Sequence, residues 1–189
     1  DIESMPRSIL LWRSMTQWLG GIGIIVLFIA ILPFFSAARQ RLYASEIPGI
    51  NQDGLTLRIR DTARAMLKIY LILSVAECLL LLALGMNLFD AVCHTFTTIA
   101  TAGFSTRNGS IAAFDSLFIE LVMIVFMILA GCNFTLHYFF LNKHWKTYWK
   151  DVEFRAYIRL LLAAVVILCM VTWISGTAGS FGKSLRDSL

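Results

Sequence analysis

Four long apolar stretches divide the chain, and each is long enough to cross a membrane as a helix. A helix of about 20 residues spans the hydrocarbon core of a bilayer. The stretches cover residues 18–35, 66–86, 117–141 and 156–175, and the first extends back towards Ile9. The polar segments between them are therefore predicted to lie at the two membrane faces.

The connecting segments differ in charge, and this difference predicts how the chain is oriented. Connections one and three are rich in bases: Arg39, Arg41, Arg58, Arg60, Arg64, Lys68, Lys143, Lys146, Lys150, Arg155 and Arg159. The middle connection, residues 87–116, holds one base, Arg107, against Asp90 and Asp115. Because basic loops stay in the cytoplasm, the first and third connections are predicted to be cytoplasmic and the middle one external.

Composition supports a membrane protein. Of the 189 residues, 58% are hydrophobic and 15% are charged, which is too apolar for an ordinary soluble domain. The net charge of +4 is explained by the cytoplasmic loops, so we predict no nucleic-acid binding. The four cysteines lie in or beside apolar stretches, without a C-x-x-C pair, and are interpreted as small buried hydrophobic residues: Cys78, Cys93, Cys132 and Cys169.

The middle connection is unusual because its first part is apolar. Residues 88–100, "LFDAVCHTFTTIA", form a predicted helix of roughly 20 Å, which is too short to cross. The small residues of "TAGFS" and the polar run "TRNGS" follow it. This order is typical of a re-entrant hairpin, and irregular backbone at membrane depth is tolerated only where it is buried or lines a water-filled cavity. The hairpin therefore predicts a cavity, and the cavity indicates transport.

The residues after the short helix suit the binding of a dehydrated cation. A potassium filter replaces the ion's hydration shell with backbone carbonyl oxygens that point the same way. Gly103 can adopt the positive φ that such a path requires, and Thr101 offers a hydroxyl as well as a carbonyl. The preceding half-helix directs its partially negative C-terminus inward, which favours a cation. We therefore predict that K⁺ is coordinated by the carbonyls of Thr101, Ala102 and Gly103.

Three stretches carry a resemblance to a known family. These are "WRSMTQWLGGIGIIVLFIAILP", "NLFDAVCHTFTTIATAGFST" and "FDSLFIELVMIVFMILAGCNF". They resemble the Trk/Ktr/HKT superfamily of potassium transporters, specifically the TrkH-type membrane subunit. The resemblance implies potassium uptake through a carbonyl-lined filter, with no enzymatic activity, and its filter residues fall on Thr101, Ala102, Gly103, Phe104 and Ser105. Thr98, Ala100 and Glu120 are candidate supports of the filter or of the short helix.

The resemblance also implies an all-α fold made of four repeats, each with an outer helix, a pore helix with filter and an inner helix. This chain would hold about four spanning helices and one re-entrant pore hairpin, as a segment of a longer polypeptide. The implied parts are the end of repeat one at 1–35, a cytoplasmic linker at 36–60, repeat two at 61–141, a second linker at 142–155, and the start of repeat three at 156–189. Within repeat two, the implied outer helix covers 61–86, the pore helix 88–100, the filter 101–105 and the inner helix 115–141. The other three filter strands and the gating loop of the family would lie outside this chain.

Several partners follow from the resemblance alone. It implies K⁺ as the transported ion, a bacterial inner membrane with the filter on the extracytoplasmic side, and no organic cofactor. It also implies a homodimer that docks a cytoplasmic nucleotide-binding regulatory subunit. The basic loops are candidate docking surfaces, although contact with inner-leaflet lipid predicts the same charges. The coupling ion, H⁺ or Na⁺, stays open, as does channel-like conduction.

Two ionisable residues within apolar segments have alternative interpretations. Glu77 lies in mid-span and is either a coupling-ion or proton site or, as we favour, a structural group buried against another repeat. His94 lies on the short helix, where satisfied packing is favoured over ligation or pH sensing. Glu120 either reaches the interface or, as we favour, anchors the pore helix by hydrogen bonds.

Two other functions compete with potassium uptake. One is that of a Ktr-like or Na⁺-permeable relative in the same superfamily, which the residues of the other filter strands would decide. The other is that of a polytopic membrane enzyme that uses His94, Glu77 or Glu120. No Ser-His-Asp or paired-carboxylate spacing supports the enzyme.

Overall fold

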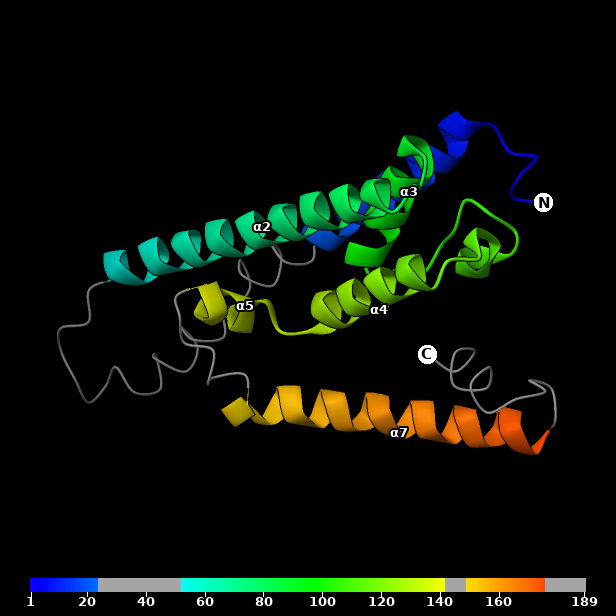
Figure 1. Cartoon of the computed structure of the whole chain (residues 1–189). Helices are drawn as coiled ribbons and strands as arrows, with labels where there is room; N and C mark the ends of the chain where they lie inside the picture. Colours follow the sequence, from blue (N-terminus) through cyan, green and yellow to red (C-terminus); the bar gives the residue numbers. More distant parts are fainter. Residues whose placement is uncertain (24–51, 142–148, 176–189) are drawn as a thin grey trace. The chain divides into compact units, whose positions relative to one another are not determined.

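The computed structural model describes residues 1–23, 52–141 and 149–175 of the chain, with side chains of the second segment described from Arg64 to Phe140. Helices are the regular elements of these segments, and the first helix covers residues 7–23. The other elements are α2 (Gln52–Ala83), α3 (Leu88–Ile99), the 3₁₀ helix η1 (Ser110–Phe114), α4 (Leu117–Gly131), α5 (Phe134–Leu141) and α7 (Val152–Ile174) (Figure 1). The chain forms two compact units, Asp1–Phe134 and Thr135–Leu189.

Among the described residues, two helices are long and apolar enough to cross a membrane. They are the Arg64–Ala83 part of α2 and the whole of α7, and α4 with α5 would make a third if the pair is one span. The span predicted at 18–35 and the pore-helix start predicted after residue 175 lie largely outside the described residues. The division into repeats stays a prediction.

Helix α2 turns directly into α3 through a glycine. The amide of Gly85 donates to the Leu82 carbonyl at 3.0 Å, and that of Met86 donates to Leu81 at 3.1 Å. Gly85 has a φ of +90°, which completes a Schellman motif that ends α2. Asn87 then caps α3, because its side chain accepts from the Asp90 amide at 2.9 Å. The short helix is therefore folded back against the long one.

Helices α2, α3 and α4 and the first helix lie together in the first unit (Figure 1), and two apolar clusters hold them. One lies near the α2–α3 turn, and its buried members are Leu81, Met86, Ala91, Ile119 and Met123. The other lies deeper along α3, and its buried members are Tyr70, Ile99 and Phe126. One cluster contacts the start of α3 at Ala91 and the other contacts its end at Ile99, so together they fix the direction of that helix.

The first helix packs closely against α2 and α3 at Trp18. The Tyr70 hydroxyl donates to the Trp18 carbonyl at 3.0 Å, and the Trp18 indole donates to Ser74 Oγ at 3.0 Å. The Trp18 ring also lies 5.1 Å, centroid to centroid, from that of Phe96 on α3. Segments more than 50 residues apart are thereby joined around one aromatic contact.

We expect Gly21→Ala to destabilise this packing, whereas Gly20→Ala should not. A Cβ at Gly21 would lie 2.5 Å from the Tyr70 hydroxyl oxygen and 3.4 Å from the Ala100 Cα. The hydroxyl cannot shift without losing its bond to Trp18, so the clash should cost about 1–3 kcal/mol. A Cβ at Gly20 meets nothing within 4 Å, and alanine favours helix by about 1 kcal/mol. The melting temperatures of the two purified full-length variants check this, and equal temperatures would contradict it.

The span predicted at 117–141 is divided in the structure into two helices, which together are long and apolar enough for one broken span. Helix α4 ends at Gly131, Cys132 has extended backbone with a ψ of 155°, and α5 begins at Phe134. Gly131 and Asn133 both have low helix propensity, which weakens the helix locally without interrupting the apolar run. The apolar stretch predicted to be an inner helix therefore contains a break near its predicted cytoplasmic end.

Helix α7, in the second unit, begins directly after the N-cap residue Asp151. The Asp151 side chain accepts from the Phe154 amide at 2.7 Å. The 23 residues of α7 give a length of roughly 35 Å, enough to cross a bilayer. Most of its large apolar side chains are exposed, among them Leu160 and Ile174. In a membrane protein, such a surface faces lipid or another helix.

Candidate ion-binding hairpin

The chain leaves α3 through two residues with positive φ. The amide of Thr101 donates to the Thr98 carbonyl at 2.9 Å, and that of Ala102 donates to Thr97 at 2.8 Å. This is again a Schellman pattern, with Thr101 at the position that glycine usually occupies. Thr101 has a φ of 54° and Gly103 a φ of 73°. A β-branched residue at positive φ is an outlier, and such strain persists mainly where a functional site requires it.

The carbonyl oxygens after this turn fall into two groups. The Phe104 carbonyl accepts from Thr97 Oγ1 at 2.9 Å, and the Ser105 carbonyl accepts from Arg13 Nη2 at 2.6 Å. Within the described segments, no donor bonds to the carbonyls of residues 101–103. Backbone carbonyls are rarely left without a partner, so these three are available to water or to an ion. Thr101 and Gly103 are exposed in this structure.

Ser105 and His94 fix the far end of the hairpin. The His94 Nε2 lies 3.0 Å from Ser105 Oγ, and its Nδ1 lies 2.8 Å from the Asp90 carbonyl oxygen. Because a carbonyl only accepts, Nδ1 carries the proton and Nε2 accepts from the Ser105 hydroxyl. Burial lowers the pKa of His94, which favours this neutral form. The favoured interpretation of His94, satisfied packing, agrees with this bonding.

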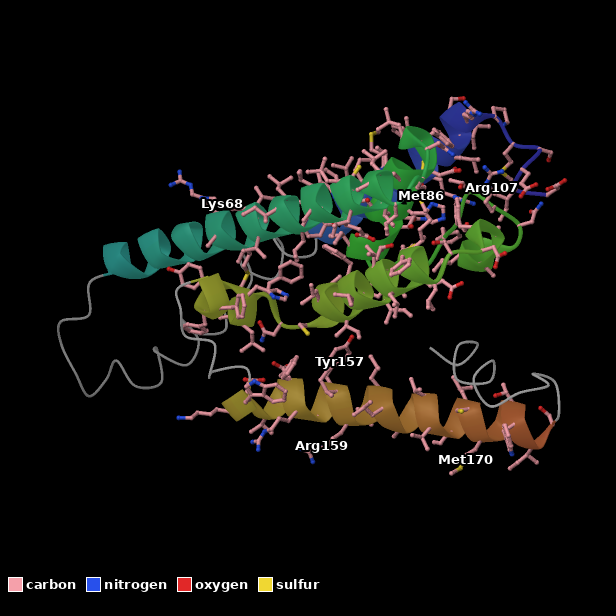
Figure 2. The ribbon with its side chains drawn as sticks, in the orientation of Figure 1. Lys68, Met86, Arg107, Tyr157, Arg159 and Met170 are labelled. Carbon is pink, nitrogen blue, oxygen red and sulfur yellow. The ribbon has the colours of Figure 1, made fainter. Side chains whose placement is uncertain are left out.

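Asp90 organises the chain that leaves the hairpin. Its Oδ1 accepts from the Thr106 hydroxyl at 2.6 Å, and its Oδ2 accepts from Asn87 Nδ2 at 2.6 Å and Arg107 Nη2 at 3.1 Å. Figure 2 shows Arg107 at the end of the unit where Met86 marks the α2–α3 turn. Burial alone would raise the pKa of Asp90, but these hydrogen bonds and the Arg107 charge lower it below its ordinary value.

The predicted supporting residues lie behind or beside the hairpin. Thr98 is buried, and Ala100 is next to Gly21 of the first helix. Glu77 is fully buried, and the Thr98 hydroxyl lies near its carboxyl, yet neither carboxyl oxygen makes a hydrogen bond of good geometry to any residue that the structure describes. Glu120 lies in the first turn of α4, and its anchoring role stays a prediction.

Sequence reasoning did not identify three of the residues that hold the hairpin. Arg13 is 92 positions from Ser105, so no local pattern links them. Thr97 was visible only as one of a run of hydroxyl residues. Asp90 was considered only as a loop charge, although an acid three residues after Asn87 at a helix start is a signal that could have drawn attention to it.

Membrane-length helices, together with a half-length helix that ends in a turn with positive φ, define a helical membrane protein. Comparison with known proteins identifies the family. The family model described as "TrkH: Cation transport protein" matches residues 1–180, and the chain belongs to this family.

Named relatives agree with this assignment. The chain is 44% identical over 174 residues to the Trk system potassium uptake protein TrkH of Salmonella typhimurium, and covers 36% of that protein. It is 37% identical over 189 residues to TrkG of Escherichia coli, another Trk system potassium uptake protein, and covers 39% of it. Their names describe transporters rather than enzymes. The alignments include 91% and 99% of this chain.

A solved structure is also similar. The crystal structure of the potassium transporter TrkH from Vibrio parahaemolyticus matches with a TM-score of 0.81 and 37% identity. The match covers all of this chain and 38% of that one. The chain thus spans little more than a third of the length of the relatives that it matches.

Proposed function

We propose that the chain is part of a potassium uptake transporter and that residues 101–105 supply one strand of its selectivity filter. The observation that carries this is the division of the carbonyls. Those of residues 101–103 have no partner within the described part of the chain, whereas those of Phe104 and Ser105 are bonded away. The names of the relatives, which are potassium uptake proteins, support the choice of ion.

The geometry suits partial dehydration of a monovalent cation. Carbonyl oxygens can replace the water molecules around K⁺ when they are fixed in place and left unbonded by the protein. The C-terminus of α3 lies directly before these carbonyls, and its partial negative charge adds to the attraction. The turn after α3 fixes the first of them, because the amides of Thr101 and Ala102 are bonded back to the helix.

The wider organisation follows from the family and is part of the proposal. Residues 61–141 would form one repeat, and three further filter strands would complete the ring around the ion. The protein would work as a homodimer in the bacterial inner membrane, with the filter on the extracytoplasmic side. A cytoplasmic nucleotide-binding subunit of the Trk/Ktr type would regulate it.

Uptake of K⁺ by the full-length protein tests the proposal. Expressed in a bacterium that lacks its own potassium uptake systems, the protein should restore growth at low K⁺. It should also take up ⁸⁶Rb⁺, and K⁺ should compete with this uptake far better than Na⁺. Equal competition by Na⁺ would instead favour the Na⁺-permeable alternative. Absence of any ⁸⁶Rb⁺ uptake by protein that has reached the membrane would contradict potassium transport.

A further inference from the structure

The first helix contacts the hairpin through one arginine. Nη2 of Arg13 donates to the Ser105 carbonyl at 2.6 Å, and its guanidinium carbon lies 5.0 Å from the centroid of the Phe104 ring. One side chain thus holds a carbonyl and an aromatic ring of two consecutive residues. Arginine suits both contacts, because its planar group can donate along its edge while its face stacks on a ring.

The two bonded carbonyls of the hairpin are held from different segments. Thr97 of α3 holds the Phe104 carbonyl from within the same helix–turn unit. Arg13 holds the next carbonyl from a helix that precedes it by 92 positions. Since the second bond is charge-assisted, it is expected to be the stronger of the two. The direction of the hairpin after Gly103 therefore depends on the position of the first helix.

Further contacts place the start of the chain against the same hairpin. The Ile2 amide donates to Asn108 Oδ1 at 2.9 Å, and the Asn108 amide donates to Glu3 Oε1 at 3.4 Å. Trp18 fixes the other side of Arg13 through its bonds to Tyr70 and Ser74. Arg13 is thus carried on a helix that is anchored on both sides of it.

We propose that Arg13 is a positioning residue that sets the ion preference of the filter. By holding the Ser105 carbonyl and the Phe104 ring, it fixes the end of the strand whose start, at residues 101–103, offers the unbonded carbonyls. The inference rests on the proposed function. In the repeat scheme, the first helix belongs to the preceding repeat, so Arg13 makes the filter geometry of one repeat depend on its neighbour.

Among the described residues, the rest of the Arg13 guanidinium offers no bond at Nε that could compensate for a lost contact. Its Nε is buried and bonds to no acceptor in the described segments. Without the guanidinium, the Ser105 carbonyl would also lose its donor and would be free to rotate. Loss of Arg13 should therefore change which carbonyls face the ion path, in addition to any effect on stability.

Competition by Na⁺ for ⁸⁶Rb⁺ uptake, measured in the full-length protein, tests the inference. Arg13→Gln should lower the preference for K⁺ over Na⁺ by roughly tenfold, since a charged hydrogen bond is lost. Arg13→Lys should lie between this variant and wild type, because lysine can donate to the carbonyl but lacks the flat stacking face. Melting temperatures of the same proteins separate preference from stability.

Arg7→Gln is the matched control. Arg7 lies on the same helix and its guanidinium carbon is 5.6 Å from the Phe89 ring centroid, so it shares the ring contact without reaching the Ser105 carbonyl. It should keep wild-type preference. If Arg13→Gln does not reach the membrane, Arg13→Lys decides.

Three results would overturn the inference. The first is an unchanged preference for K⁺ over Na⁺ in Arg13→Lys, and also in Arg13→Gln if that variant reaches the membrane. This result would count against the inference even if the melting temperatures of the variants were lowered. The second is an equal loss of preference in the Arg7 control. The third is a wild-type protein that takes up no K⁺, which would remove the proposed function and this inference together. A wild-type protein that prefers K⁺, with unchanged Arg13 variants, would remove the inference alone.

Discussion

Replacing Gly103 with serine is expected to abolish most of the preference for K⁺ over Na⁺ in the full-length transporter. Gly103 has a φ of +73°, a conformation that costs an L-residue about 1–2 kcal/mol. A Cβ there would meet nothing within 4 Å, so the effect comes from backbone strain rather than from a clash. The strand can relieve that strain by rotating the peptides around residue 103, which turns unbonded carbonyls away from the ion.

The size of the effect follows from the precision that a filter needs. Selectivity depends on the number and placement of the oxygens around the ion, so one displaced carbonyl changes the coordination of every ion that passes through the filter. A strain of about 1–2 kcal/mol corresponds to a factor of roughly 5–30, and we expect the ratio of K⁺ to Na⁺ competition for ⁸⁶Rb⁺ uptake to fall by roughly this factor.

Gly85→Ser is the matched control for this substitution. Gly85 has a φ of +90° and, as at Gly103, an added Cβ would meet nothing within 4 Å. It lies in the α2–α3 turn, where it completes the Schellman motif. We expect Gly85→Ser to lower the melting temperature and to leave the ion preference unchanged. Unchanged preference in Gly103→Ser, or the same loss in both variants, would argue against a filter at Gly103.

The helices could be predicted largely from the apolar pattern, because a membrane imposes a length on them. The segment predicted at 88–100 is helical from Leu88 to Ile99. Its half-length was readable because a helix of 12 or 13 residues cannot cross a bilayer. The break after Gly131 was missed because the prediction depended on the mean hydropathy of a long window. One asparagine, Asn133, does not lower that mean enough to divide the apolar stretch.

The hairpin geometry was only partly predictable. The need for positive φ at Gly103 could be inferred, because glycine is the residue that adopts it readily. Positive φ at Thr101 could not, because a β-branched residue is expected to avoid it. The donors that hold Phe104 and Ser105 also escaped prediction. Thr97 reaches the Phe104 carbonyl only because of the turn after α3, and Arg13 reaches the Ser105 carbonyl only because the first helix packs against the hairpin. Local sequence patterns cannot show that Arg13 and Ser105, which are 92 positions apart, are in contact.

The second large effect is expected from Asp90→Asn, which should lower the stability of the hairpin by about 2–3 kcal/mol. The carboxylate accepts three side-chain hydrogen bonds, from Thr106, Asn87 and Arg107. An asparagine of the same shape offers an oxygen to Thr106 but presents its NH₂ group to the other two donors. The charge of Arg107 contributes only a small part of this loss of stability, because its side chain is 44% exposed and solvent screens the ion pair.

The pH dependence of this effect has a definite sign. The hydrogen bonds and the Arg107 charge hold the pKa of folded Asp90 below its ordinary value of 3.8. A group with a lowered folded pKa contributes stability above its unfolded pKa and loses it as pH falls through the folded value. The melting temperature of wild type should therefore exceed that of Asp90→Asn at pH 7, and the gap should narrow below about pH 4. A gap that stays constant down to pH 3 would show that ionisation of Asp90 is not its source.

Asp151→Asn provides the control for removing one carboxylate by the same substitution. Asp151 caps α7 by accepting from the Phe154 amide, a bond that an asparagine oxygen makes equally well. Its stability should lie within about 0.5 kcal/mol of wild type at pH 7. If Asp90→Asn were no less stable than Asp151→Asn, the three bonds to Asp90 would not be holding the hairpin. The Asp90→Asn variant keeps its filter residues but has a less stable hairpin, because Asp90 on α3 holds the strand after Gly103 through Thr106 and Arg107. We therefore expect its ⁸⁶Rb⁺ uptake to fall more steeply on warming than that of wild type.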